Sequence, residues 1–122
     1  MQLKRIPCDF SVCKVADYSL VNLQAEYCLI GRTDEENSLV CLTQDVPTNA
    51  VQRDDGWKAF RIQGVLDFSL IGILSRITSI LAEAEVGVFA VSTFNTDYVL
   101  IKTAQYEKAL TALARAGYII TD

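Results

Sequence analysis

The segment from residue 70 to residue 103 constrains the fold more than any other part of the chain. Residues 88–94 and 97–103 indicate two strands, and Asn95-Thr96 between them suits a two-residue hairpin turn, because asparagine tolerates left-handed backbone angles. A helix of about four turns is predicted before them, since apolar residues recur at i, i+3, i+4 and i+7. Its apolar face consists of Leu70, Ile73, Leu74, Ile77, Ile80, Leu81 and Ala84.

The residues on either side extend this segment to a larger pattern. Residues 57–64 indicate a strand before the helix, residues 105–116 a second helix, and residues 118–121 a closing strand. Gly117 is placed at the C′ position of the second helix. The order β-α-β-β-α-β is the ferredoxin-like pattern, in which an antiparallel sheet carries both helices on one face. The predicted fold class is therefore α+β.

The first 56 residues indicate mostly β-structure with no long helix. Residues 4–15, 27–32 and 38–43 predict strands, and the last two predict a hairpin. Residues 44–56 include Pro47, Asn49 and Gly56, and they predict a loop with a short helix near 48–52. We therefore predict a domain boundary there, with an abbreviated N-terminal subdomain over 1–56 and a complete domain over 57–122.

Composition narrows the class of function. The net charge is −4, and no basic run exceeds Lys4-Arg5, so the concentrated positive field of a nucleic-acid-binding protein is missing. No apolar run is long enough for a membrane span, and the N-terminal residues do not resemble a signal peptide. These features predict a soluble cytoplasmic protein. The apolar content of 51% is high for 122 residues, which favours a face reserved for another subunit.

The chain offers little for metal or cofactor chemistry. It contains no histidine, no C-x-x-C pair and no glycine-rich phosphate loop. The four cysteines are Cys8, Cys13, Cys28 and Cys41, and the last three lie in apolar, strand-like runs. We predict buried reduced thiols rather than a disulfide framework or a zinc site, and no metal or cofactor.

Two polar regions flank the predicted helix and hairpin. At the helix start, the loop 68–72 would present free backbone N–H groups to an anion, with Asp67 or Ser69 as the N-cap. At the strand end, Ser92-Thr93-Phe94 and Asp97 supply hydroxyls and a carboxylate. A zwitterionic amino acid needs these groups. Simpler roles are close packing at Gly72, hydration of the hydroxyls, and a turn aspartate that caps its own loop.

The run LIGILSRI, followed by LAEAEVGVFAVSTFNTDYVLIK, resembles the ACT-domain proteins of the amino-acid-binding CASTOR type, most closely in STFNTDYVL. The resemblance implies an ACT-like N-terminal half followed by a complete ACT unit. It also implies a regulatory sensor without catalysis, whose small amino-acid ligand lies at an interface between ACT units. The arginine sensors contain two copies of this whole unit, so a homodimer is implied for this chain.

The resemblance also assigns a ligand-binding site. The loop would hold the ligand α-carboxylate, and Asp97 would face its cationic group. The arginine sensors carry acidic residues where this chain has Ser69 and Leu70, so a smaller or neutral amino acid is as compatible as arginine. The implied site residues are Ser69, Leu70, Ile71, Gly72, Ile73, Thr93, Phe94 and Asp97.

Two other functions are compatible with the sequence. A protein–protein interaction adaptor would need no metabolite. A small enzyme would have to use a carboxylate such as Asp67 or Asp97, or a perturbed lysine, as its general base, and a ferredoxin-like fold does not exclude this.

Overall fold

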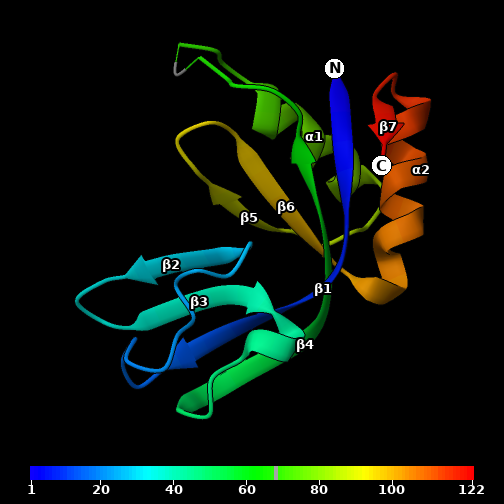
Figure 1. The fold of residues 1–122 in the computed structure, drawn as a ribbon. Coiled ribbons are helices and arrows are strands. Elements are labelled where there is room, and N and C mark those ends of the chain that lie inside the picture. The colour runs from blue at the N-terminus through cyan, green and yellow to red at the C-terminus, as the bar shows by residue number, and fades with distance from the viewer. Residues whose placement is uncertain (68) are drawn as a thin grey trace. The chain divides into compact units, whose positions relative to one another are not determined.

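A computed structural model describes residues 1–67 and 69–122, so the predicted loop residue Phe68 lies outside the described part. The chain divides into two compact units, which are described separately (Figure 1). The larger unit contains Met1–Pro7 and Lys58–Asp122, and the smaller unit contains Cys8–Trp57. The elements are β1 (Gln2–Val15), β2 (Cys28–Arg32), β3 (Asn37–Leu42), η1 (Thr43–Asp45), β4 (Ala50–Ile62), α1 (Ile73–Glu83), β5 (Phe89–Ser92), β6 (Asp97–Lys102), η2 (Thr103–Gln105), α2 (Tyr106–Arg115) and β7 (Ile119–Thr121).

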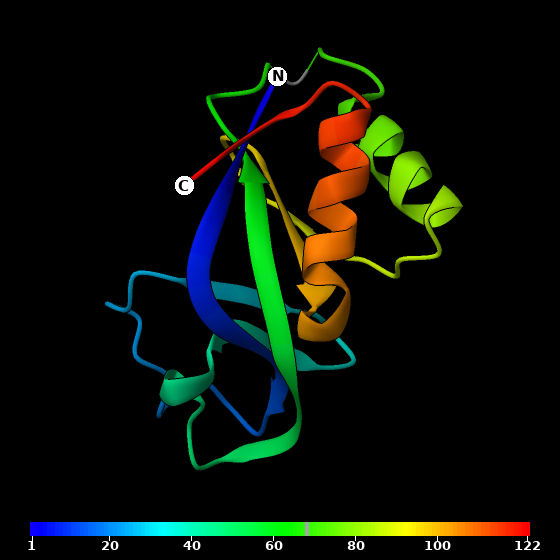
Figure 2. The ribbon, with the colours of Figure 1, turned by 90° about the vertical axis from the view of Figure 1, so that its right-hand side faces the viewer.

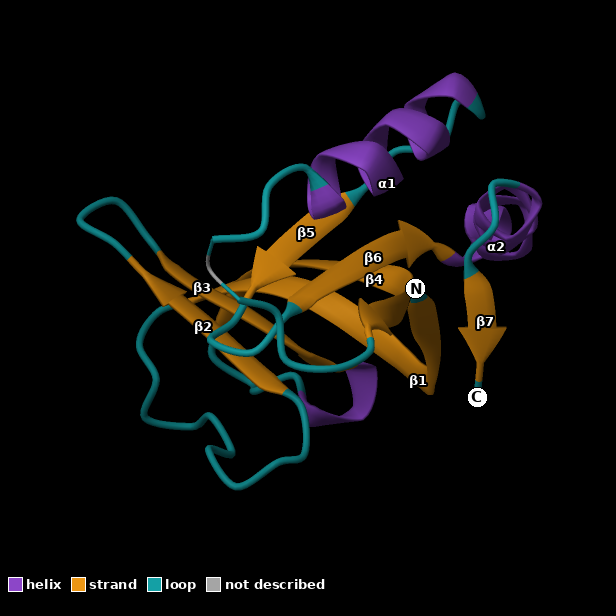
Figure 3. Cartoon of the chain, turned by 90° about the horizontal axis from the view of Figure 1, so that it is seen from above, coloured by secondary structure: helices purple, strands orange, loops and turns teal. Residues whose placement is uncertain are grey.

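The larger unit is the predicted α+β, ferredoxin-like layer structure. Its strands lie in the order β7-β1-β4-β6-β5, and α1 and α2 cover the same face of this sheet (Figures 2 and 3). The start of β1 pairs in parallel with β7, with Leu3 opposite Ile120. The first residues of the chain therefore lie between β7 and β4. The pattern β-α-β-β-α-β does not contain this pairing of β1 with β7. Whether residues 57–122 form a domain on their own remains a prediction.

Helix α1 begins three residues later than the apolar periodicity predicts. Gly72 is the N-cap, and its φ of 83° lies in the left-handed region, where a helix cannot continue. Leu70 is consequently not part of the buried helical face, because its side chain is 53% exposed. The prediction that Asp67 or Ser69 caps this helix was also wrong. Asp67 instead closes a local turn, in which its Oδ1 accepts a hydrogen bond from the Ser69 N–H at 2.8 Å.

The core of the larger unit lies between the two helices and the sheet. Ile77 and Leu81 of α1 meet Phe60 and Ile62 of β4 there, and all four side chains are fully buried. The predicted apolar face of α2 is confirmed, since it supplies Tyr106, Ala109, Leu110 and Leu113. Gly117 follows the C-cap Ala116 at the predicted C′ position, with a φ of 103°.

Tyr106 makes the stability of this core sensitive to alkaline pH. Its hydroxyl donates a hydrogen bond of 2.6 Å to the Ala59 carbonyl oxygen, and burial raises the pKa of the phenol to about 12. The unfolded chain releases this proton near pH 10 while the native state retains it. The stabilisation that comes from this raised pKa is therefore complete below about pH 10 and is lost as the pH rises towards 12. At pH 11 the free energy of unfolding is lower by about 1.4 kcal/mol.

We expect Tyr106→Phe to remove this part of the pH dependence. Cys41, whose pKa burial raises to about 12, contributes to both proteins and cancels in the comparison. Urea denaturation of both proteins at pH 8 and pH 11 measures the difference. An identical loss of unfolding free energy in the two proteins would show that Tyr106 ionises freely in the native state.

The smaller unit is built on strands in the order β2-β3-β1-β4. The predicted hairpin is confirmed, because β2 and β3 pair with Cys28 opposite Cys41. The predicted loop over 44–56 is confirmed only for residues 46–49, and the predicted short helix near 48–52 was wrong, since β4 already begins at Ala50. Charged residues at consecutive positions of this strand, such as Asp54 and Asp55, hide the strand from a hydrophobic pattern.

The thiols of the smaller unit lie largely inside its core. Cys13 and Cys41 are buried, Cys28 is half-buried beside them, and all four cysteines of the chain are free. Burial raises the pKa of the Cys13 and Cys28 thiols as well, which disfavours the reactive thiolate. Within the described residues, no group of three or more His, Cys, Asp or Glu side chains is arranged to hold a metal ion. No described helix has the length and apolar character needed to cross a bilayer.

Candidate functional site

A cleft of about 290 Å³ opens between the loop before α1 and the loop that joins β5 to β6. Both loops belong to the larger unit. The first loop and the first turn of α1 contribute Leu66, Asp67, Leu70, Gly72, Ile73, Leu74 and Ser75. The second loop and the adjoining strand ends contribute Ser92, Thr93, Phe94, Asn95, Thr96 and Asp97. The two polar regions that the sequence analysis singled out thus face the same hollow.

The loop between β5 and β6 has four residues, so the predicted two-residue turn was wrong. The pairing of the strands ends with Ser92 opposite Asp97. Thr93 closes the loop, because its backbone N–H and its hydroxyl both donate to the Thr96 carbonyl oxygen, at 2.8 and 2.9 Å. Asn95 does not have the left-handed backbone that we predicted, since Glu85 is the one non-glycine residue with positive φ in the described ranges.

Hydrogen bonds tie this loop to the end of β4. Thr96 is buried, and its hydroxyl donates to the Ile62 carbonyl oxygen at 2.7 Å. The Leu66 N–H donates to the Asn95 carbonyl oxygen, also at 2.7 Å. The loop between β5 and β6 is therefore anchored to the end of β4 and is joined directly to the other wall of the cleft at Leu66.

The carboxylates of Asp67 and Asp97 line the cleft. Asp97 is half-buried, and its Oδ1 accepts a hydrogen bond from the Ser92 hydroxyl at 2.5 Å. Its Oδ2 makes no hydrogen bond or ion pair with another described residue. The hydrogen bond from the Ser69 N–H holds the pKa of the Asp67 carboxyl below its usual value, so Asp67 is ionised at neutral pH. Since none of the described residues that line the cleft has a basic side chain, the two carboxylates favour a cationic group.

The N-terminus of α1 supplies the opposite charge preference. No side chain caps this helix among the described residues, and its first intrahelical bond joins the Arg76 N–H to the Gly72 carbonyl oxygen at 2.9 Å. The N–H groups of the first turn therefore remain available to an anion, which the helix dipole also favours. Gly72, Ile73 and Ser75 of this turn line the cleft.

The structure brings together most of the predicted site residues. Leu70, Gly72, Ile73, Thr93, Phe94 and Asp97 line the cleft, whereas Ser69 and Ile71 do not. Ile71 is 94% exposed and lines a different pocket. Whether these residues bind a ligand remains a prediction.

The sequence analysis did not place Leu66, Leu74, Ser75, Asn95 or Thr96 at the site. Leu74 and Ser75 join it because α1 starts late, which leaves its first turn at the cleft. The segment STFNTD already contained Asn95 and Thr96, and a four-residue loop would have placed both at the wall.

Comparison with known proteins identifies the family. The sequence model described as "ACT domain" matches residues 52–115.

The chain belongs to the ACT-domain family.

A solved structure is similar to nearly the whole of the ACT protein. An X-ray structure of a protein from Agobacterium tumefaciens has 31% sequence identity and a TM-score of 0.85, and the match covers 98% of this chain and 90% of that one. A Vibrio cholerae protein of unknown function, described as a possible transport protein, has 17% identity and a TM-score of 0.70, with 92% and 86% of the two chains covered.

Regulatory parts of aspartate kinase share the fold. The ligand-free regulatory subunit of the Thermus thermophilus enzyme matches at 11% identity with a TM-score of 0.58, over 94% of each chain. No match was found among curated proteins. The comparisons do not distinguish the CASTOR type from other ACT proteins, so that finer assignment remains a prediction. Family membership supports a regulatory module that binds a small ligand.

Proposed function

We propose that this ACT protein is a non-catalytic sensor of a small amino acid, of the CASTOR type, which acts in the cytoplasm. The observation that carries this proposal is the cleft itself, where the uncapped N-terminus of α1 and the Asp97 carboxylate face one hollow. The helix end suits the α-carboxylate of the ligand, and the half-bonded Asp97 suits its ammonium group. The volume of about 290 Å³ lies at the lower end of ligand pockets, which favours a small amino acid.

The proposed sensor works as a homodimer. Several apolar side chains around the cleft are exposed to solvent. Leu70, Ile71 and Phe94 are among the exposed large hydrophobic residues of the chain. Exposed apolar groups rimmed by polar ones favour a protein interface. A second copy of this chain, packed over these exposed side chains, would close the cleft and complete the binding site.

The acid–base properties of the cleft support binding rather than catalysis. A general base works best with a pKa near the operating pH. The backbone hydrogen bond to Asp67 lowers the pKa of that carboxyl, which makes it a weaker base. We infer that the Asp67 carboxylate holds a ligand and transfers no proton.

A thermal-shift panel of the common amino acids at millimolar concentration tests the proposal. A ligand present at about 100 times its Kd stabilises the native state by about 2.7 kcal/mol, which is a readily measured rise in Tm. No rise for any amino acid would contradict the sensor proposal.

We expect Asp97→Asn to weaken binding of the active amino acid on the order of tenfold to a hundredfold, because the contact changes from charge-assisted to neutral. Asparagine can still accept the Ser92 hydroxyl, so the fold and the dimer should remain intact. The matched control is Asp34→Asn, an exposed carboxylate in the turn between β2 and β3. Isothermal titration and sedimentation measure both properties. Dissociation of the dimer by Asp97→Asn, together with no ligand response, would favour the adaptor function instead.

A further inference from the structure

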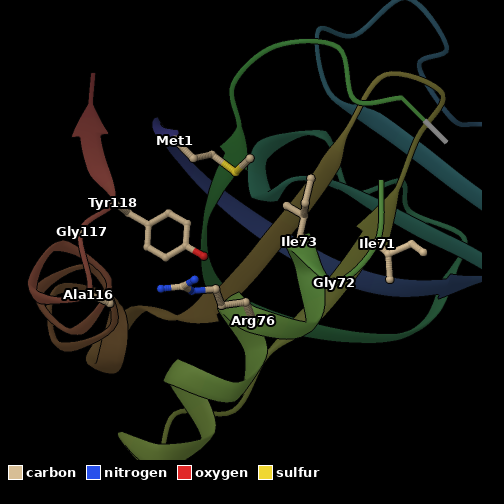
Figure 4. Close-up of a pocket in the computed structure, with 8 residues that line it drawn as sticks. All are labelled: Met1, Ile71, Gly72, Ile73, Arg76, Ala116, Gly117 and Tyr118. Carbon is tan, nitrogen blue, oxygen red and sulfur yellow. The ribbon is translucent and has the colours of Figure 1, made fainter. Parts of the chain in front are cut away.

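A second hollow in the larger unit has a different chemistry from the cleft. Its volume is about 350 Å³, and it shares Gly72 and Ile73 with the cleft but none of the carboxylates (Figure 4). The other side of this pocket comes from the end of α2 and the residues after it, Ala116 to Tyr118, and from Met1. The proposed amino-acid site does not account for it, although three of the implied site residues, Ile71, Gly72 and Ile73, line it.

Among the described residues that line this pocket, Arg76 is the only one with a charged side chain. The described residues include no ion-pair partner for its guanidinium and no hydrogen-bond partner for the Tyr118 hydroxyl. Figure 4 shows the Arg76 side chain extending towards the Tyr118 ring, so that both polar ends lie on the same side of the pocket. Two hydrogen-bond donors, one of them cationic, therefore face a pocket that contains no acidic side chain.

The carbonyl end of α2 is the neighbouring backbone group that disfavours an anion, and hydrogen bonds reduce this effect. The last carbonyl oxygens of α2 could repel one, but those of Ala112, Leu113 and Ala114 already accept backbone hydrogen bonds from residues 116–118. Gly117 has a φ of 103° and no heavy atom within 4 Å of the position of a Cβ, which leaves this wall of the pocket open. The backbone bond of 3.1 Å from the Tyr118 N–H to Leu113 holds Tyr118 in place.

We propose that this pocket binds a small organic carboxylate, which the guanidinium of Arg76 and the hydroxyl of Tyr118 hold together. A guanidinium matches the two oxygens of a carboxylate with parallel hydrogen bonds. Met1 and Ile73 supply apolar wall for a short aliphatic chain. The pocket lacks a carboxylate that would meet an ammonium group, so its ligand is a carboxylic acid without an amino group. This site adjoins the proposed amino-acid site, with which it shares Gly72 and Ile73, and it takes a different class of ligand.

Titration of the full chain with butanoate, and with butanamide as its neutral isostere, tests this proposal. Chemical-shift mapping should give saturable binding for butanoate at residues around Arg76 and none for butanamide. Arg76→Gln is expected to weaken butanoate binding on the order of tenfold to a hundredfold, because a charged hydrogen-bonding group is lost. Tyr118→Phe removes one neutral hydrogen bond, so a loss of about twofold to tenfold is expected.

Two controls separate this pocket from other sites. Arg115→Gln removes an exposed cation in the last turn of α2, outside the pocket, and should leave butanoate binding unchanged. Asp97→Asn should also leave it unchanged, because Asp97 lines the cleft and not this pocket. Arg76 is exposed, so its substitution should not change the melting temperature. The proposal is overturned if butanoate does not saturate the native protein, if Arg76→Gln binds as well as the native protein, or if Asp97→Asn abolishes binding.

Discussion

Replacement of Phe60 by alanine is expected to lower the free energy of unfolding by about 3–5 kcal/mol. Phe60 is fully buried in the core between the helices and the sheet, where Leu3, Ile77 and Leu81 are also fully buried. The substitution removes a large apolar side chain and leaves a cavity that rigid strands on both sides of β4 cannot close. Urea denaturation at neutral pH measures the change.

Phe94→Ala provides a control with the same chemical change. Phe94 is 78% exposed at the mouth of the cleft, so we expect the unfolding free energy to change by less than about 1 kcal/mol. The same variant should weaken the binding of an amino acid that stabilises the native protein. If Phe60→Ala and Phe94→Ala lowered the free energy of unfolding equally, this would show that Phe94 packs in a core despite its large exposed fraction.

A fragment of residues 57–122 is expected to fail to fold cooperatively, although the sequence predicts a complete domain over this range. The fragment lacks Gln2–Lys4, the strand segment that pairs with β7, and it lacks the buried side chains of Leu3 and Ile6. Without them, β7 has no partner in the order β7-β1-β4. Circular dichroism should show no thermal transition for the fragment, in contrast to the full chain.

Addition of a peptide of residues 1–15 should restore a transition to the fragment, because the peptide supplies the whole of β1. A shuffled peptide of the same composition serves as the control. A cooperative transition of the fragment alone, at the temperature of the full chain, would establish residues 57–122 as an independent domain.

The apolar patterns predicted the elements of the larger unit well. Ile77 and Leu81 on α1, and Leu110 and Leu113 on α2, are buried as their helical spacing indicates. The start of α1 could not be predicted in the same way. Leu70 continues the helical spacing, but the left-handed backbone of Gly72 interrupts the helix before it. Periodicity records which side chains are apolar, not where the backbone changes direction.

The apolar patterns also could not predict the pairing of strands that are distant in the sequence. The start of β1 pairs with β7 rather than remaining with the first half of the chain, and no local feature of Gln2–Lys4 indicates a parallel partner near residue 120. The extent of β4 was missed because its solvent-exposed half alternates poorly. The extent and pairing of such strands depend more on tertiary contacts than on the local strand propensity of their residues.

The candidate site was predicted more successfully than its local geometry. Thr93, Phe94 and Asp97 were selected by their chemistry, and they line one cleft with Gly72 and Ile73. The hydrogen bond between the Ser92 hydroxyl and Asp97 requires the register that places these two residues opposite each other. A two-residue turn between the strands would have given a different register, so the sequence alone could not predict that contact.

The parallel pairing of β1 with β7 has a consequence for synthesis of the chain on the ribosome. Residues Gln2–Lys4 emerge before the rest of the larger unit, but their partners Ile119–Thr121 are translated more than a hundred residues later. Until then this edge of β1 carries unpaired N–H and carbonyl groups, which can associate with strands of other nascent chains. The larger unit therefore completes its sheet only after translation has passed residue 121, and its yield in cells should depend on chaperones that bind ribosome-associated chains.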